Sequence, residues 1–394
     1  MNRKLLLVVL ALTSLSSVCA QTVPNPPPVT QPVTSSPTSW PIVVQPSAAA
    51  PAPARLPNSP GGRLLLLRGN ASPYELWTVR PDGTNAERVP VPGLELREDV
   101  IPSPDGKSLL LIRSQAQDRI TRRSLELYDL AIGQTTVLVS APITGTGVQE
   151  AQWSPDGSAI AFTSDAQNGQ GVFDIWLARP DGTDIRPMTR FSVTTTARLN
   201  NEASWFSVPR AEAAGMVFPG AHTLQWSPDG KWIAFACVAD WQASPAVKIV
   251  RVADGDLIST KAVIGQYHRD EFAWTPDSHG LLYLNIPGRD QTWQADLDDM
   301  QPVLLTKRPV IGPWSPDRTR MAFNVWPSGK LVNPEIWLYE YDSGQSHLLV
   351  QAADLDAADK TNGHSRWSNP WLGASAQSPW SPDGRWVAFI AHTS

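Results

Sequence analysis

Three histidines are the side chains of this sequence best suited to general acid or base chemistry. His222, His268 and His364 fall in or beside predicted connections between repeated units, where residues from distant parts of a chain can converge. Linear enzyme motifs are missing: there is no Gly-x-Ser-x-Gly, no His-Glu-x-x-His and no pair of cysteines at zinc-binding spacing. These features favour binding without a cofactor or metal. Catalysis by residues from several loops is the alternative.

Aromatic and basic side chains outside the regular pattern are the candidate ligand-binding residues, because Trp and Arg commonly anchor recognition surfaces. A structural role, in which the same side chains cover long insertions, is the competing interpretation. The candidates are Trp205, Phe206, Trp241, Trp326, His364, Arg366, Trp367, Trp371, His268 and Arg269.

A repeated phrase defines the elements that must position these residues. Trp-Ser-Pro-Asp-Gly occurs at residues 153–157, 226–230 and 380–384, and related copies occur at 102–106, 274–277 and 314–317. Pro presets the first turn position, the Asp side chain accepts a backbone hydrogen bond, and Gly tolerates the positive φ. Each phrase therefore predicts a hairpin between two apolar strands. Asp277 is followed by Ser278-His279-Gly280, which predicts a longer hairpin in that copy. Arg318 stands where Gly is expected, which should cost some strain, and we interpret both departures as drift.

A second phrase adds two further strands to each unit. Residues 174–182 read Asp-Ile-Trp-Leu-Ala-Arg-Pro-Asp-Gly, with counterparts at 75–83, 247–255 and 335–344. Four antiparallel strands repeated at this spacing predict an all-β propeller. The count favours six blades, with the ends of the chain sharing one blade. Seven blades, two of them incomplete, are the less favoured alternative.

These residues resemble the TolB-like propeller family, whose WD40-like repeat has the same Trp-Ser-Pro-Asp-Gly, Ile-Ala-Phe and Ile-Trp-Leu elements. The resemblance covers residues 58–394. It implies a six-bladed periplasmic propeller that serves as a protein-binding scaffold. The α/β domain that precedes the propeller in TolB has no counterpart in this sequence.

The two long insertions decide where a ligand would bind. Turns between first and second strands, and between third and fourth strands, lie on one face, which we call the turn face. Second-to-third loops and connections between blades lie on the opposite, crossover face. Insertions at residues 190–223 and 351–377 are expected on the crossover face, half a turn apart in a six-bladed ring, and long loops are often functional.

The N-terminus predicts export. Residues 1–20 have the cationic start, apolar run and small-residue cleavage site of a signal peptide, too short to span a bilayer. Lipidation at Cys19 is a less favoured alternative. Residues 21–57 form a Pro-rich flexible linker. The chain after cleavage carries a net charge of -7 instead of -5, which disfavours nucleic acid, and Cys237 is expected to be a buried, unreactive thiol.

Together these patterns predict a periplasmic or secreted monomer without a membrane span. Its expected partner is an envelope or extracellular protein, peptide or glycan. A secreted lyase or hydrolase that acts on a polysaccharide or peptide is the alternative.

Overall fold

The computed structural model describes residues 9–10, 64–68, 74–80, 84–94, 99–117, 120–140, 146–167, 172–191, 220–238, 246–263, 272–284, 291–326, 334–351, 367–372, 379–381 and 383–393. Every regular element within these ranges is a β-strand. None of them is a helix long and apolar enough to cross a membrane.

The described strands form seven sheets in chain order. The opening sheet has three strands, β2 (Leu64–Arg68), β3 (Tyr74–Val79) and β4 (Glu87–Leu94). The second sheet contains β5 (Asp99–Pro102), β6 (Ser108–Gln117), β7 (Ile120–Asp129) and β8 (Gln134–Val139). The third contains β9 (Val148–Trp153), β10 (Ile160–Ser164), β11 (Asp174–Ala178) and β12 (Arg186–Pro187).

The remaining sheets follow the same plan. The fourth contains β13 (Gly220–Trp226), β14 (Trp232–Val238), β15 (Ala246–Arg251) and β16 (Leu257–Val263). The fifth contains β17 (Phe272–Trp274), β18 (Gly280–Leu284), β19 (Thr292–Asp296) and β20 (Pro302–Thr306). The sixth contains β21 (Arg320–Val325), β22 (Glu335–Glu340) and β23 (Gln345–Val350), and the closing sheet contains β24 (Trp367–Trp371), β25 (Phe389–Thr393) and β1 (Val9–Leu10).

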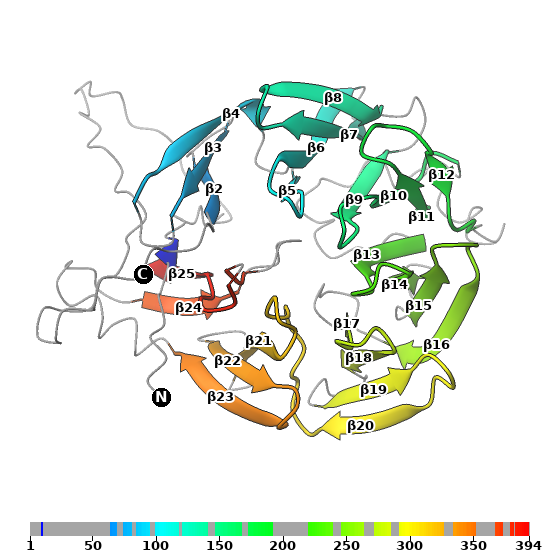
Figure 1. Cartoon of the computed structure of the whole chain (residues 1–394), viewed down its shortest axis with the longest axis vertical. Coiled ribbons are helices and arrows are strands. Elements are labelled where there is room, and N and C mark those ends of the chain that lie inside the picture. The colour runs from blue at the N-terminus through cyan, green and yellow to red at the C-terminus, as the bar shows by residue number, and fades with distance from the viewer. Residues whose placement is uncertain are drawn as a thin grey trace, which may run out of the picture.

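The sheets stand side by side around a central opening, as the blades of a propeller do (Figure 1). Consecutive strands within the opening through sixth sheets pair antiparallel, so each of these sheets is an antiparallel meander of three or four described strands. The predicted all-β propeller is therefore confirmed.

The predicted closure, with both ends of the chain in one sixth blade, is not confirmed. The strands β2 to β4 form a sheet of their own, while β25 pairs antiparallel with β24 and parallel with β1. The difference arises at Trp367–Trp371, which the sequence analysis assigned to a loop and the structure assigns to β24. Pro370 interrupts the strand pattern there, and the register with β25 shifts between Ser368 and Trp371.

The core is a series of apolar layers between neighbouring sheets. Between the fourth and fifth sheets, for example, Val247 and Ile249 pack in one cluster with Phe272, Trp274 and Tyr283. Similar clusters join the other sequential neighbours from the opening sheet to the closing sheet. Cys237 is buried in one such layer, and burial raises the pKa of its thiol, as expected for an unreactive cysteine.

Candidate binding surfaces

The repeated tryptophans link neighbouring sheets on the side of the turns. In each case the indole Nε1 donates a hydrogen bond to a backbone carbonyl of the preceding sheet. Because the rings are also buried or half-buried, these side chains hold the sheets together and are unsuited to ligand recognition, as predicted. The five pairs are Trp153 to Ile101 (3.4 Å), Trp226 to Gln152 (3.4 Å), Trp274 to Gln225 (3.0 Å), Trp314 to Trp274 (2.9 Å) and Trp380 to Pro313 (2.9 Å).

The Ser-Pro-Asp-Gly turns use their own polar groups. In the third sheet, the Ser154 hydroxyl donates to Asp156 Oδ1 at 2.6 Å and accepts from the amide of Ala159 at 2.9 Å. The amide of Ser158 also donates to Asp156 Oδ1, at 3.0 Å. The same three bonds recur in all six copies, with Thr275 replacing Ser in the fifth sheet. The longer hairpin predicted after Asp277 is therefore wrong, because Ser278 takes the place of Gly in a turn of the usual length.

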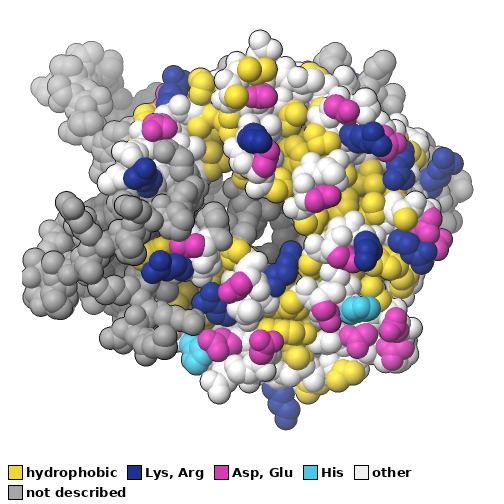
Figure 2. Space-filling model, viewed as in Figure 1, with side chains coloured by type: hydrophobic (Ala, Val, Ile, Leu, Met, Phe, Trp, Pro, Cys, Tyr) yellow, Lys and Arg dark blue, Asp and Glu magenta, His cyan; other side chains and the backbone are white. Residues whose placement is uncertain are grey.

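These bonds stabilise the ionised form of the turn carboxylates. The hydroxyl of Ser154 and the amide of Ser158 hold the pKa of Asp156 below its ordinary value, and Ser315 acts likewise on the pKa of Asp317. With their polar groups engaged locally, the turns offer few free donors or acceptors to a ligand. Figure 2 shows acidic and basic side chains interspersed around the central hollow.

Most of the predicted ligand-binding residues lie outside the described part of the chain. This applies to Trp205, Phe206, Trp241, His268, Arg269, His364 and Arg366. Trp367 and Trp371 are the first and last residues of β24, so their prediction as loop residues was wrong. Trp326 follows β21 directly and is half-buried at the crossover end of the sixth sheet. His222 belongs to β13, where its ring meets Phe173 edge-on at 5.9 Å.

The ends of the two insertions are attached on opposite sides of the ring. Residues 192–219 connect the third and fourth sheets, and residues 352–366 connect β23 to β24. Figure 1 shows β12 and β13 on the right and β23 and β24 on the left, across the central opening.

A buried carboxylate holds the start of the first insertion. Asp174, at the crossover end of β11, is fully buried. It accepts hydrogen bonds from the backbone amide of Phe191 at 2.7 Å and from the hydroxyl of Thr189 at 3.1 Å. That hydroxyl accepts from the amide of Ile175 at 2.9 Å. Asp174 thus fixes the last described residue before the insertion.

The neighbouring residue holds the end of the same insertion. The carbonyl of Phe173 accepts a hydrogen bond from the amide of Ala221 at 2.8 Å, next to the ring contact with His222. Phe191 packs edge-on against Phe235, and Lys248 lies 5.8 Å above the Phe191 ring. Both ends of residues 192–219 therefore leave from one rigid base, which we call the insertion clamp (residues 173–174 with Phe191 and Ala221).

The clamp leaves a nearby indole without a partner. Trp77 and Trp337 occupy the same position in their sheets and donate to the glutamate two residues earlier, Glu75 and Glu335 respectively. At Trp176 that residue is Asp174, whose carboxylate bonds Thr189 and Phe191. The Nε1 of Trp176 is buried and has no hydrogen-bond partner among the residues that the structure describes. Asp174, which is shorter than the glutamate of the other sheets, therefore bonds the clamp residues and does not accept a hydrogen bond from the Trp176 indole.

A second buried carboxylate orders the crossover connection between the second and third sheets. Asp165 is fully buried and accepts from the amides of Thr146 and Gly147, both at 2.8 Å. Gln149 donates to the Thr146 hydroxyl and accepts from Arg123 of β7 at 3.1 Å. Neither buried aspartate could be recognised in the sequence, because an Asp at the end of a strand resembles an ordinary turn residue.

Within the described ranges, no three His, Cys, Asp or Glu side chains gather in a group that could hold a metal ion.

No protein-family model and no curated protein sequence matches this chain. Solved structures similar to it include TolB from Acinetobacter baumannii, at 17% identity and a TM-score of 0.44 over 74% of this chain. The chain spans 64% of the length of that structure. An oligogalacturonate lyase in complex with manganese has 14% identity and a TM-score of 0.47, over 74% of each chain.

The β-propeller domain of the Trilobed protease from Pyrococcus furiosus is a further similar structure. It has 11% identity and a TM-score of 0.42, over 68% of this chain and 74% of that domain. The class to which this chain belongs follows from its own strands: it is a β-propeller.

Proposed function

We propose that this chain is an exported β-propeller that binds a protein, peptide or glycan through the insertions of its crossover face, without catalysing a reaction. The observation that carries the proposal is the insertion clamp. A fully buried carboxylate and a neighbouring carbonyl fix both ends of residues 192–219. A rigid base lowers the entropy lost when a loop binds its ligand, so it favours recognition by the loop it holds.

The composition of the clamped insertion supports the same role. It contains Trp205 and Phe206 within the stretch Arg-Leu-Asn-Asn-Glu-Ala-Ser-Trp-Phe at 198–206. Aromatic side chains bury large areas with few rotatable bonds, and the adjacent Asn and Arg side chains add hydrogen bonds that give specificity. His268 and Arg269 belong to a shorter connection that we assign to the rim of the same surface.

Export is the second part of the proposal. The cationic start, the apolar run and Ala20 support cleavage before Gln21, and residues 21–57 would then form a Pro-rich arm in front of the propeller. Cleavage there would remove β1, so the closing sheet of the mature protein would keep only β24 and β25 of the three strands described for it. N-terminal sequencing of the protein recovered from its native cell envelope tests this directly. We expect Gln21 as the first residue; an intact Met1 or an acylated Cys19 would contradict it.

Binding is tested by replacing Trp205 and Phe206 together with Ala and measuring capture of a partner from native envelope extract. We expect capture to fall at least tenfold while the unfolding temperature stays within about 2 °C of the wild type, since surface substitutions change stability little. The matched control is Ile132→Ala, an apolar side chain that is 65% exposed on the turn face. It should leave capture unchanged.

Three results would contradict the proposal. One is unchanged capture by the double variant, and another is unfolding of that variant, which would make the two residues part of the core. The third is turnover of a cell-wall polysaccharide or peptide that disappears in His268→Ala or His364→Ala, because it would favour a secreted lyase or hydrolase.

A further inference from the structure

Arg318 occupies a backbone conformation that the repeat otherwise reserves for small residues. The last position of the Ser-Pro-Asp-Gly turn has a positive φ in all six copies. Four copies place Gly there, at φ values from 64° to 73°. In the sixth sheet the residue is Arg318, at φ 54°. A long side chain is strained in this region, and such strain often marks a functional position.

The other exception in the repeat has a structural explanation. Ser278, at φ 65°, is 5% exposed, and its hydroxyl accepts a hydrogen bond from the amide of Asp229 at 3.0 Å. Ser278 therefore joins the turn of the fifth sheet to the turn of the fourth. Among the described residues, Arg318 makes no comparable side-chain bond to the preceding turn.

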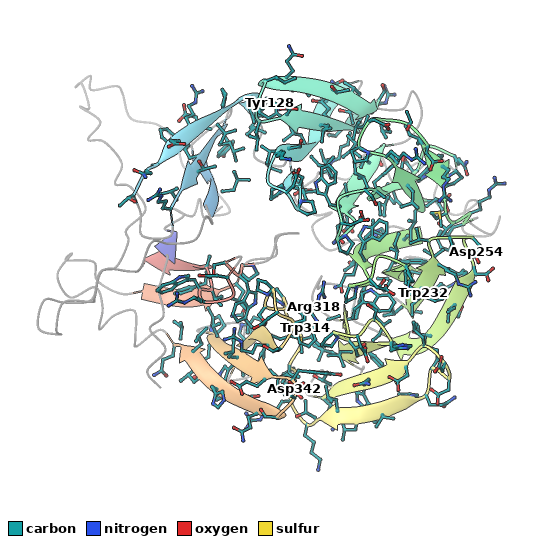
Figure 3. All side chains as sticks on the ribbon, in the orientation of Figure 1. Tyr128, Trp232, Asp254, Trp314, Arg318 and Asp342 are labelled. Atoms are coloured by element: carbon teal, nitrogen blue, oxygen red, sulfur yellow. The ribbon has the colours of Figure 1, made fainter. Side chains whose placement is uncertain are left out.

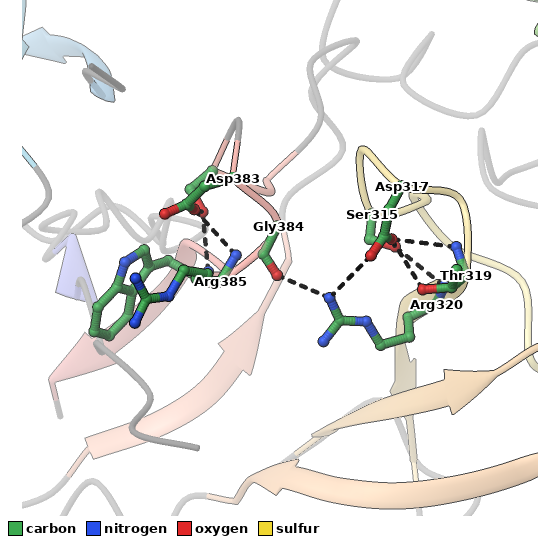
Figure 4. A network of polar contacts seen from close by, with 9 residues as sticks. Ser315, Asp317, Thr319, Arg320, Asp383, Gly384 and Arg385 are labelled. Atoms are coloured by element: carbon green, nitrogen blue, oxygen red, sulfur yellow. Dashed lines mark hydrogen bonds and ion pairs between the residues drawn. The ribbon is translucent and has the colours of Figure 1, made fainter. Parts of the chain in front are cut away.

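Two arginines of the same turn differ sharply in their contacts. Arg320 forms an ion pair with Asp317 at 3.6 Å and donates to the carbonyl of Gly384 at 3.0 Å (Figure 4). Its guanidinium also lies 5.3 Å from the centre of the Trp380 ring. Among the described residues, none accepts a hydrogen bond from the guanidinium of Arg318 or forms an ion pair with it. Burial lowers the pKa of the Arg318 guanidinium, so the group has lost part of its hydration without a protein partner in return.

The nearby turn carboxylates are already engaged. Asp317 Oδ1 accepts from the hydroxyl of Ser315 at 2.5 Å and from the amide of Thr319 at 3.2 Å. Asp277 Oδ1 accepts from the hydroxyl of Thr275 and the amide of His279. Neither has Arg318 as a partner. Figure 3 places Arg318 beside the central opening, within reach of a molecule that enters it.

We propose that Arg318 anchors an oxyanion-binding site at the turn-face mouth of the central opening, where it takes a carboxylate or phosphate group. The planar guanidinium presents parallel N–H donors that match either group with two hydrogen bonds. Such a ligand supplies the acceptors that the fold does not provide. This site lies at the opposite end of the opening from the insertions, so it does not depend on the proposed function.

The test is a titration of the full chain with sodium phosphate and, separately, with sodium acetate, at constant ionic strength. The signal followed is the side-chain Nε–H resonance of Arg318 in nitrogen-15 NMR spectra, assigned by its disappearance in Arg318→Gly. We expect a saturable shift with at least one of the two anions. The anion that saturates the shift at the lower concentration shows whether the site prefers a phosphate or a carboxylate group. Arg385→Ala, which removes an exposed arginine from the turn of the closing sheet, should leave the titration unchanged.

The Gly variant separates binding from folding, because Gly is the residue that four of the six copies carry at this position. We expect Arg318→Gly to fold with an unfolding temperature at or above that of the wild type. The saturable stabilisation by the anion, measured as the rise in unfolding temperature, should disappear in Arg318→Gly and persist in Arg385→Ala. A linear, unsaturable shift of the Arg318 signal with both anions would overturn the site. So would equal anion-dependent stabilisation of the wild type and Arg318→Gly.

Discussion

The two faces of this propeller differ in how they use polar side chains. On the turn face, six copies of one motif satisfy Ser, Asp and backbone amides within six residues, and five indoles link successive sheets. On the crossover face, Asp165 and Asp174 are each unique, fully buried and bonded to a connection between sheets. Because the turns of the turn face are bonded locally and hold the sheets together, the connections on the crossover face can vary in length.

The comparison shows where each kind of residue is replaceable. Each repeated indole of the turn face bonds two neighbouring sheets, so a change there affects the ring as a whole. A buried carboxylate that holds a single insertion has no second copy. We therefore expect substitutions on the turn face to alter global stability, and substitutions in the insertion clamp to alter one loop and its ligand.

The largest expected effect is at an indole that links two sheets. Trp274 is 2% exposed and donates to the carbonyl of Gln225 at 3.0 Å. Trp274→Ala should lower the free energy of unfolding by about 4 kcal/mol, because it leaves a large cavity between the fourth and fifth sheets. Urea denaturation measures this loss. A loss below about 1 kcal/mol would show that the indoles do not hold the ring.

A somewhat smaller loss is expected in the insertion clamp. Asp174→Ala removes the acceptor of the Phe191 amide and the Thr189 hydroxyl, and should lower the free energy of local opening at the clamp by about 3 kcal/mol. Hydrogen exchange should accelerate at Phe191 and Ala221 while the amides of the fifth sheet keep their protection. Equal acceleration in both places would mean that the clamp belongs to the global core.

Acid should weaken the turn face specifically. Hydrogen bonds from Ser154 and Ser315 lower the folded-state pKa values of Asp156 and Asp317 below those of the unfolded chain. Their contribution to stability is therefore complete above the unfolded pKa, about 4, and is lost as the pH falls through the lower folded values. We expect a falling urea midpoint below about pH 4 and a shallower fall in Ser154→Ala. A midpoint that rises on acidification would contradict this.

The smallest effect has the opposite sign. Arg318→Gly removes left-handed strain at φ 54°, so it should stabilise the chain by about 1 kcal/mol. Calorimetric unfolding in a chloride buffer, free of phosphate and carboxylates, checks this. Destabilisation would mean that the Arg318 side chain stabilises the fold by more than its left-handed backbone conformation costs, which would contradict the strain proposed at this position.

The turn face could be predicted from the sequence because its structure is local. Each Ser-Pro-Asp-Gly copy contains its own turn residue, acceptor and donor, so the phrase at 226–230 was sufficient to place β13 and β14. The role of the repeated tryptophans followed from their fixed position in that phrase.

Ring closure and the clamp could not be predicted, because they depend on long-range pairing. β24 contains Pro370 and pairs with β25, whose partner residues lie 19 to 26 positions later in the chain, and no local pattern marks it as a strand. Asp174 differs from Glu75 and Glu335 by one methylene, and the consequence depends on Thr189 and Phe191, which lie beyond the end of β12. Arg318 was recognisable in the sequence as a departure from the repeat. Whether its guanidinium has a partner among the described residues depends on the three-dimensional arrangement of the turns.

The central claim is that the crossover face, and not the turn face, carries the macromolecular ligand. Photo-crosslinking tests it most directly, with a benzophenone amino acid placed at residue 205, at residue 269 or at residue 132. We predict adducts with one envelope component from positions 205 and 269 and none from position 132. An adduct from position 132 alone would contradict the account.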